Sequence, residues 1–158
     1  MGINPNQLKK YIIIPTLEKF NLCSDSAVNL ILGTAAVESD MGYFLKQNNG
    51  TAIGIYQMEQ ATHHDIWINY LTYHPAPVDI MIEYLGSSNL VFASANQLIS
   101  NLNHATIMTR IHYLRVPEKL PEANDVEGLA RYWKKYYNTS AGKGTEKDFM
   151  LKYQMYVD

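Results

Sequence analysis

Apolar residues recur at helical spacing in several parts of this chain of 158 residues. The clearest run follows Ser24, Asp25 and Ser26, which are residue types that favour the N-cap of a helix. Its apolar positions are Val28, Ile31, Leu32, Ala35 and Ala36. This spacing predicts a core helix with a buried apolar face, and it places Glu38 at the C-terminal end of that helix.

The same spacing predicts further helices. They cover 6–20, about ten residues after a cap at Thr62, a short segment at 78–85, the long segment 90–114, a segment from Asn124 to about Tyr137, and a last helix capped by Thr145. Pro15 is expected to kink or split the first of them, because proline has no backbone N–H to donate. Asn124 and Glu127 resemble a capping box, and the stretch 86–88 (Gly-Ser-Ser) breaks the chain between two helices.

One stretch differs from the helices because it is rich in residues that form turns. It covers 42–57 and contains Gly42, Asn48, Asn49, Gly50 and Gly54. This composition predicts a loop or a small β-hairpin. The chain therefore predicts a mostly α fold of about six or seven helices with a small irregular or β-rich insert, which is an α+β pattern. Its length fits a single domain over 1–158.

Composition and charge limit the classes of partner. Hydrophobic residues make up 47% of the chain and charged residues 18%, and the formal net charge is -2. A chain without excess positive charge is not expected to bind nucleic acid or an anionic membrane surface strongly. The first residues show no signal-peptide pattern, and the longest apolar runs are too short for a membrane span. We therefore expect a chain that is made as a soluble protein, acts as a monomer and does not insert into membranes.

The histidines form no recognised metal-binding motif. His63, His64 and Asp65, with Glu59 and His74 nearby, match no zinc spacing. We interpret the first three as surface residues at a helix start, and we expect no metal and no cofactor. The chain has one cysteine, so no disulfide can form within it.

Glu38 is the strongest candidate for acid–base chemistry. It ends an apolar helix and precedes the glycine-rich stretch 42–57. A carboxyl group between an apolar wall and a cleft has its charged form desolvated, which raises its pKa. A general acid that works near neutral pH needs such a shift. By position alone, an exposed glutamate at a helix end is the commoner arrangement. The evidence for a catalytic Glu38 therefore has to come from the surrounding motifs.

Three short motifs surround this residue in the sequence. They are the pair Glu38-Ser39, the run 52–57 (Ala-Ile-Gly-Ile-Tyr-Gln) with Thr62 beyond it, and the pair Tyr137-Asn138 before small residues and glycines. Together they resemble the soluble lytic transglycosylase family. The family pattern is a Glu-Ser pair, then Ala-x-Gly-Leu-Met-Gln with a proline and a threonine, then Tyr-Asn. Here isoleucine and tyrosine stand for the Leu-Met of that pattern, and Gln60 stands for its proline.

The resemblance implies a lysozyme-like fold and an enzyme that cleaves peptidoglycan glycan strands. Glu38 would protonate the oxygen that links N-acetylmuramic acid to N-acetylglucosamine. Its carboxylate would then take the proton of the muramic C6 hydroxyl, which attacks the anomeric carbon and closes a 1,6-anhydro ring. The substrate supplies the nucleophile, so this chemistry needs neither a second protein carboxylate nor a cofactor.

The resemblance also implies roles for residues around the catalytic glutamate. The expected substrate-binding residues are Ser39, Gly54, Tyr56, Gln57 and Tyr137. Ser39 and Gln57 would hydrogen-bond the glycan or orient the glutamate. Gly54 would let the sugar approach closely, and Tyr56 would shape a subsite. Tyr137 would lie against the glutamate, a place for which Tyr132 and Tyr136 are alternatives.

Two other functions remain open at this stage. One is a hydrolytic lysozyme of goose or phage type, which needs a second group to activate water. Asp40 and Glu59 are the candidate carboxylates, and Thr51 could position the water. The other is a non-catalytic virion or envelope scaffold that binds glycan. A compact chain without an export signal suggests a bacteriophage protein that reaches the cell wall through a holin-type pore as an endolysin, or as part of the virion.

Overall fold

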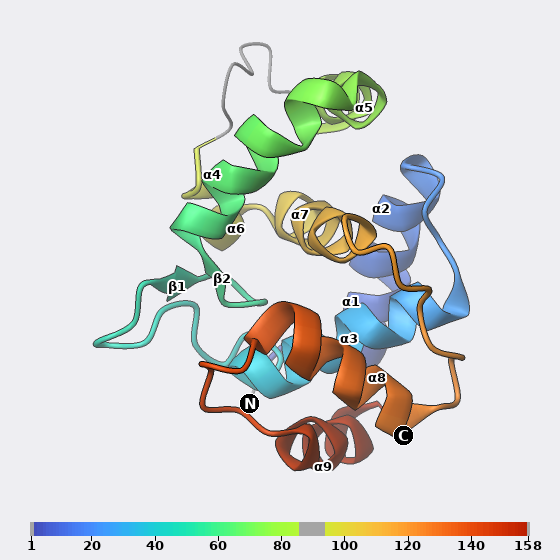
Figure 1. The fold of residues 1–158 in the computed structure, drawn as a ribbon, viewed down its shortest axis with the longest axis vertical. Coiled ribbons are helices and arrows are strands. Elements are labelled where there is room, and N and C mark those ends of the chain that lie inside the picture. The colour runs from blue at the N-terminus through green and yellow to red at the C-terminus, as the bar shows by residue number, and fades with distance from the viewer. Residues whose placement is uncertain (1, 86–93, 158) are drawn as a thin grey trace.

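The computed structural model describes residues 2–85 and 94–157, which are mostly helical with one small antiparallel sheet (Figure 1). In chain order the elements are α1 (Pro5–Leu8), the π-helical turn η1 (Lys9–Ile13), α2 (Ile14–Lys19), α3 (Asp25–Ser39), β1 (Ala52–Ile53), β2 (Met58–Glu59), α4 (Gln60–Asn69), the 3₁₀-helical turn η2 (Leu71–Tyr73), α5 (Pro75–Leu85), α6 (Gln97–Ser100), α7 (Leu102–Leu114), α8 (Val126–Trp133), the π-helical turn η3 (Lys134–Asn138) and α9 (Glu146–Tyr156). The predicted mostly α class with a small β insert is confirmed.

Helix α3 lies at the centre of the fold, with α8 and α9 on one side and η1 and α7 on the other (Figure 1). Its predicted N-cap is confirmed, because Ser24 Oγ accepts a hydrogen bond from the Ala27 amide at 3.2 Å. The helix ends where Asp40 takes a left-handed backbone conformation, with φ of 51°. Gly33 allows α9 to pack closely, since a Cβ at this position would overlap the Phe149 ring.

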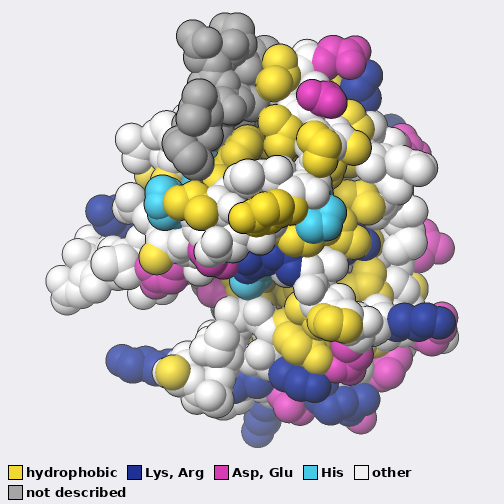
Figure 2. Space-filling model, turned by 45° about the horizontal axis from the view of Figure 1, so that its top comes forward, with side chains coloured by type: hydrophobic (Ala, Val, Ile, Leu, Met, Phe, Trp, Pro, Cys, Tyr) yellow, Lys and Arg dark blue, Asp and Glu magenta, His cyan; other side chains and the backbone are white. Residues whose placement is uncertain are grey.

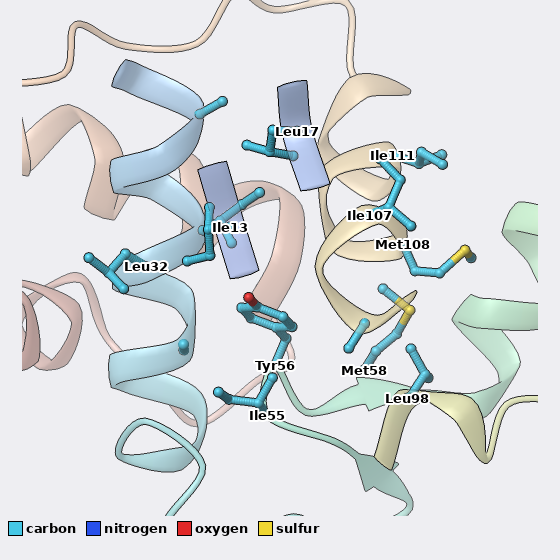
Figure 3. Close-up of a cluster of buried hydrophobic side chains, with 14 of the residues drawn as sticks. Ile13, Leu17, Leu32, Ile55, Tyr56, Met58, Leu98, Ile107, Met108 and Ile111 are labelled. Atoms are coloured by element: carbon cyan, nitrogen blue, oxygen red, sulfur yellow. The ribbon is translucent and has the colours of Figure 1, made fainter. Parts of the chain in front are cut away.

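Two apolar clusters meet at α3. The larger cluster fills the space between α2, α3, α7 and the chain around the sheet (Figure 3). The smaller one joins α3 to α7, α8 and α9 and includes Leu30, Tyr113, Trp133 and Phe149. Burial on both sides fixes α3 in place, because each buried apolar side chain contributes roughly 1.5–3 kcal/mol relative to exposure.

The N-terminal helical segment runs through Pro15 as continuous helical backbone, so the predicted split is wrong. Leu8, Ile13 and Ile14 all keep right-handed helical backbone angles, and the Ile14 amide donates to the Lys9 carbonyl in the π-helical turn η1. The hydrogen bonding changes from α to π just before the proline, which lacks an N–H to donate. Ahead of this segment, the Ile3 amide donates to the Met41 carbonyl at 2.7 Å, which ties the N-terminal residues to the loop after α3.

Several predicted helix boundaries are shifted. Helix α4 begins before Thr62, after Glu59, whose side chain makes no cap, so the predicted cap at Thr62 is wrong. The capping residue of α8 is Asp125 rather than Asn124, and its carboxylate accepts from the Gly128 amide at 2.8 Å. The predicted cap at Thr145 is confirmed, and it forms a capping box with its N3 residue.

The predicted long helix 90–114 is divided into α6 and α7 where it is described. Asn101 separates the two helices, and its side chain caps α7 by accepting from the His104 amide at 3.0 Å. Helix α5 begins at Pro75, three residues earlier than the predicted 78–85. The predicted break at 86–88 and the first residues of 90–114 lie outside the described residues.

The small sheet pairs β1 with β2 in antiparallel register, with Ala52 opposite Glu59 and Ile53 opposite Met58. Strand β1 lies near the end of the predicted insert 42–57, and β2 follows directly after it. Figure 2 shows Lys and Arg side chains mixed with Asp and Glu on the face drawn, without a continuous basic surface. Among residues 2–85 and 94–157, no helix has the length and apolar character to cross a bilayer.

Candidate active site

Glu38 lies in the last turn of α3 and lines a cavity of about 320 Å³. The other lining residues come from the loop before β1, from β1 and β2 with their connection, and from η3 and the loop after it. They are Gln47, Asn49, Gly50, Thr51, Ala52, Gln57, Glu59, Tyr137, Asn138 and Gly142. The three sequence motifs therefore contribute to one cavity. The surface is hollowed between projecting loops on the face shown in Figure 2.

Desolvation by burial raises the pKa of the Glu38 carboxyl group to about 7. The Trp133 indole N–H donates to Glu38 Oε1 at 2.9 Å, which favours the carboxylate and opposes the effect of burial. Desolvation is the larger of the two effects. Near neutral pH the group is therefore divided between its acid and its base form, as the sequence predicts for a general acid.

Tyr137 is the tyrosine that lies beside Glu38. It lines the cavity, and its hydroxyl donates to the Tyr56 carbonyl oxygen at 2.7 Å. Burial raises its pKa well above the ordinary value, and the charge of Glu38 adds to this shift. The alternatives Tyr132 and Tyr136 both donate to Glu118, through its carbonyl and carboxylate oxygens respectively.

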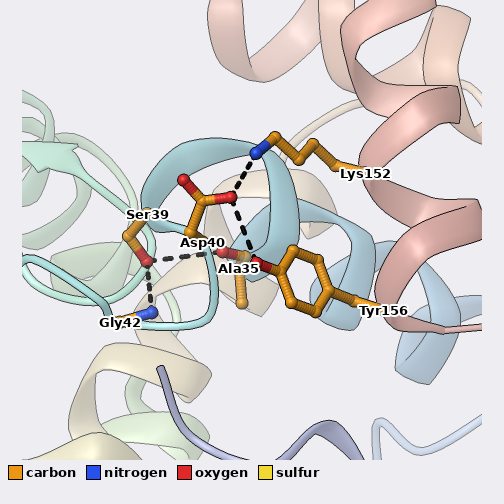
Figure 4. Close-up of polar contacts among 6 residues, drawn as sticks. All are labelled: Ala35, Ser39, Asp40, Gly42, Lys152 and Tyr156. Atoms are coloured by element: carbon orange, nitrogen blue, oxygen red, sulfur yellow. Dashed lines mark hydrogen bonds and ion pairs between the residues drawn. The ribbon is translucent and has the colours of Figure 1, made fainter. Parts of the chain in front are cut away.

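Ser39 does not face the cavity, which corrects the expected contact with glycan. It is fully buried, and its hydroxyl donates to the Ile55 carbonyl at 2.5 Å and accepts from the Gly42 amide at 2.7 Å. The latter bond and a longer one to the Ala35 carbonyl, at 3.3 Å, are drawn in Figure 4. The hydroxyl thus joins the end of α3 to the turn after it and to the connection between β1 and β2.

Tyr56 is also placed differently from its expected role. Its side chain is 1% exposed and points into the larger apolar cluster (Figure 3). Its hydroxyl shares a hydrogen bond of 2.8 Å with Thr106 Oγ1 on α7. An aromatic ring with one polar end is satisfied by this arrangement, so Tyr56 anchors the connection between the strands and contacts no substrate through its ring.

Gly54 is needed for packing against the protein and not for a close approach by a sugar. Its φ is +80°, and a Cβ here would overlap the Leu98 carbonyl oxygen. Glycine is the residue that tolerates both conditions. Gln57 keeps the expected position, since it lines the cavity, but its Nε2 donates to the Gly54 carbonyl at 2.7 Å. Its amide oxygen has no hydrogen bond from the described residues and can accept one from a ligand.

The three candidates for activating water fall in different places. Glu59 and Thr51 line the same cavity as Glu38. Asp40 does not, because its carboxylate forms an ion pair with Lys152 and accepts a hydrogen bond from Tyr156 at 3.4 Å (Figure 4). This pairing holds the side chain toward α9.

His63 is buried, so the prediction of a surface position is wrong for it. Its Nε2 lies 3.0 Å from Nε2 of His104 and 3.4 Å from Trp67 Nε1. Desolvation lowers the pKa of both histidines, to about 4 for His63 and about 3 for His104. Within the described part of the chain no cluster of three or more histidine, cysteine or acidic residues could hold a metal ion.

Trp133 was expected only as one of several aromatic residues that could stack on sugar, and its bond to Glu38 was not predicted. Trp133 lies four residues before Tyr137, so one helical turn brings both aromatic residues toward Glu38. Gln47 and Asn49 also line the cavity with carboxamide groups, and neither residue belongs to the three sequence motifs. Asn138 does belong to one of them. Lys134 fixes the loop after η3, since its Nζ donates to Asn138 Oδ1 at 2.7 Å and to the Gly142 carbonyl at 2.9 Å.

Comparison with protein-family models, curated proteins and solved structures found no match to this chain.

Proposed function

We propose that this protein is a lytic transglycosylase with a lysozyme-like fold, which cleaves the β-1,4 bond between N-acetylmuramic acid and N-acetylglucosamine in peptidoglycan. The observation that carries the proposal is the state of Glu38. A desolvated carboxyl group with a pKa of about 7 opens into a polar cavity. Such a group can donate and then accept a proton within one catalytic cycle near neutral pH.

The proposed reaction needs one protein carboxyl group. Protonated Glu38 gives its proton to the glycosidic oxygen as the bond from that oxygen to the muramic C1 breaks, and the sugar develops oxocarbenium-like charge. The resulting carboxylate takes the proton of the muramic C6 hydroxyl while O6 bonds to C1. Glu38 returns to its acid form, and the product ends in 1,6-anhydromuramic acid.

The cavity suits a neutral sugar polymer that carries acetamido groups. Gln47, Asn49, Gln57 and Asn138 contribute carboxamide side chains to the lining, and such groups can both donate to and accept from sugar hydroxyls and amides. The lining residues within the described ranges include carboxyl groups and no lysine or arginine. This favours a neutral glycan backbone over an anionic one, because like charges repel.

A hydrolytic lysozyme is the second candidate, because Glu59 and Thr51 line the same cavity as Glu38. An inverting hydrolase uses a second carboxylate roughly 6.5–9.5 Å from the acid to activate water. Glu59 is the residue that could do so, with Thr51 beside the water. In either case the cell wall is the place of action, and delivery as an endolysin or with a phage virion belongs to the same proposal.

The deciding experiment is mass spectrometry of the soluble products after purified peptidoglycan is incubated with the protein. We expect products with 1,6-anhydromuramic ends, and we expect Glu38→Gln to abolish them. The rate should fall as the pH rises through about 7, because the proton donor is then lost.

Other outcomes separate the candidates. Reducing ends that depend on both Glu38 and Glu59 would replace the transglycosylase by the hydrolase. A wild-type protein that binds peptidoglycan and releases nothing would refute both enzymes in favour of a glycan-binding scaffold.

A further inference from the structure

Trp133 is the residue that fixes the geometry of the Glu38 carboxyl group. It is the last residue of α8, and its side chain is 1% exposed. The ring packs against Phe149 of α9, with centroids 5.6 Å apart, and a Cβ at Gly144 would lie 2.7 Å from its Cη2 atom. The indole is therefore held from two sides, so the direction of its N–H is set before any substrate arrives.

That N–H reaches one oxygen of the carboxyl group and leaves the other to the cavity. Trp133 Nε1 lies 2.9 Å from Glu38 Oε1. Oε2 accepts no hydrogen bond from the described residues, and it is not among the buried atoms left without a partner, so it is open to the cavity that Glu38 lines. Tyr137, which also lies beside Glu38, directs its hydroxyl to the Tyr56 carbonyl instead.

An indole nitrogen can only donate, so Oε1 accepts in both protonation states of Glu38. The carbonyl oxygen of a carboxylic acid is a better acceptor than its hydroxyl oxygen, so this bond favours the acid form in which the proton is on Oε2. In the carboxylate form the same N–H stabilises the negative charge while Oε2 stays free to take a proton. The oxygen that gives up the proton and the oxygen that recovers one are thus the same atom.

We propose that Trp133 is a positioning residue that assigns the exchangeable proton of Glu38 to Oε2, the oxygen that faces the cavity. The assignment rests on the proposed function for its role in catalysis, since that reaction asks one carboxyl group to act as acid and then as base. Burial alone would favour the acid form and make Glu38 a weaker proton donor, which slows the first step. The indole N–H stabilises the carboxylate that the first step leaves, and so it favours the donation of the proton.

The test removes the N–H in two ways, of which only the second keeps a bicyclic ring of the same size. Trp133→Phe is compared with replacement of Trp133 by 3-benzothienylalanine, which has nearly the same shape with sulfur in place of the N–H. Trp67→Phe is the matched control, because Trp67 is 4% exposed and directs its N–H to His63. The pKa of Glu38 is measured from the carboxyl ¹³C resonance of glutamate-labelled protein, assigned by its loss in Glu38→Gln.

We expect both changes at Trp133 to raise the pKa of Glu38 by about one to two pH units, since a hydrogen bond to the charged form is lost. The control should leave that pKa unchanged. In the cleavage assay the pH profile should move upward by the same amount, with kcat lowered about tenfold and KM within twofold, because positioning affects the reacting step. A loss of packing alone would admit water and lower the pKa.

A pKa of Glu38 that stays the same or falls in the benzothienylalanine protein overturns the proposal, even if Trp133→Phe fails to fold. The titration needs no substrate, so it separates this proposal from the function. If the pKa rises as expected in a protein that cleaves no glycan, the proton assignment stands and the transglycosylase is refuted. If cleavage is found but its pH profile does not follow the titration, the transglycosylase stands and the catalytic role of Trp133 is refuted.

Discussion

Replacement of Ser39 by alanine separates a structural role from a substrate-binding one. The hydroxyl satisfies the Gly42 amide at 2.7 Å and the Ile55 carbonyl at 2.5 Å, and the change leaves both groups without this partner. The Ala35 carbonyl loses less, because it also accepts from the Met41 amide at 3.0 Å. A buried polar group without a partner costs about 1–3 kcal/mol.

Two such groups are left without a partner, and the Gly42 amide is only half-buried, so it loses less than a fully buried group. The free energy of unfolding should therefore fall by about 2–3 kcal/mol. For a chain of this length that lowers Tm by roughly 4–12 °C. Thermal unfolding followed by circular dichroism measures the loss. Ser100→Ala is the control, since its exposed hydroxyl makes one bond of 3.4 Å to the Asn96 carbonyl, and its effect should stay within about 0.5 kcal/mol.

Glycan affinity tells the two roles apart. Measured well below Tm, the KM of Ser39→Ala for peptidoglycan should stay within twofold of the wild type, because the hydroxyl is fully buried. A variant that keeps its full stability but shows a tenfold higher KM would refute the reasoning. It would return Ser39 to the substrate contacts that the sequence motif suggested.

Three further predictions concern residues around the site. Gly54→Ala should destabilise the fold by about 3 kcal/mol or more, seen as a lower Tm, because positive φ and overlap with the Leu98 carbonyl add together; a cost below 1 kcal/mol would contradict this. The free energy of unfolding should fall as pH drops from about 6.5 toward 3, because the lowered pKa values of His63 and His104 mean that the unfolded chain binds protons before the folded one does. In urea titrations at several pH values, His104→Gln should make this dependence on pH less steep. Asp40→Asn should cost at most about 1 kcal/mol, since the ion pair is only partly buried, and should change the cleavage rate less than twofold; a tenfold loss would make Asp40 catalytic.

The sequence predicted what depends on local spacing and capping. The central helix follows from its apolar positions after Ser24, and the last helix from Thr145, because both signals act within a few residues. The turn-rich stretch 42–57 was placed correctly for the same reason. Helix starts such as that of α4 were missed because Glu59 precedes the helix without a side-chain cap, which leaves no signal to read.

The roles of individual side chains were harder to predict, because they depend on contacts between distant segments. Ser39 and Tyr56 lie within a motif, yet the atoms that satisfy them belong to the protein. For Tyr56 the apolar neighbours Ile53 and Met58 were a usable sign of burial. The bond from Trp133 to Glu38 joins residues 95 positions apart, and nothing short of the packed fold reveals it.

The origin of the cavity walls has a consequence for how the protein could change. Glu38 belongs to a helix that is buried on both sides, whereas Gln47 and Asn49 belong to the loop before β1. Reactivity and ligand preference therefore reside on parts of the chain that tolerate mutation very differently. Exchanging the loop before β1 would change the groups that a ligand meets in the cavity, while the acid strength of the Glu38 carboxyl group stays constant. Variants with different ligand preferences could thus be built on one unaltered helical frame.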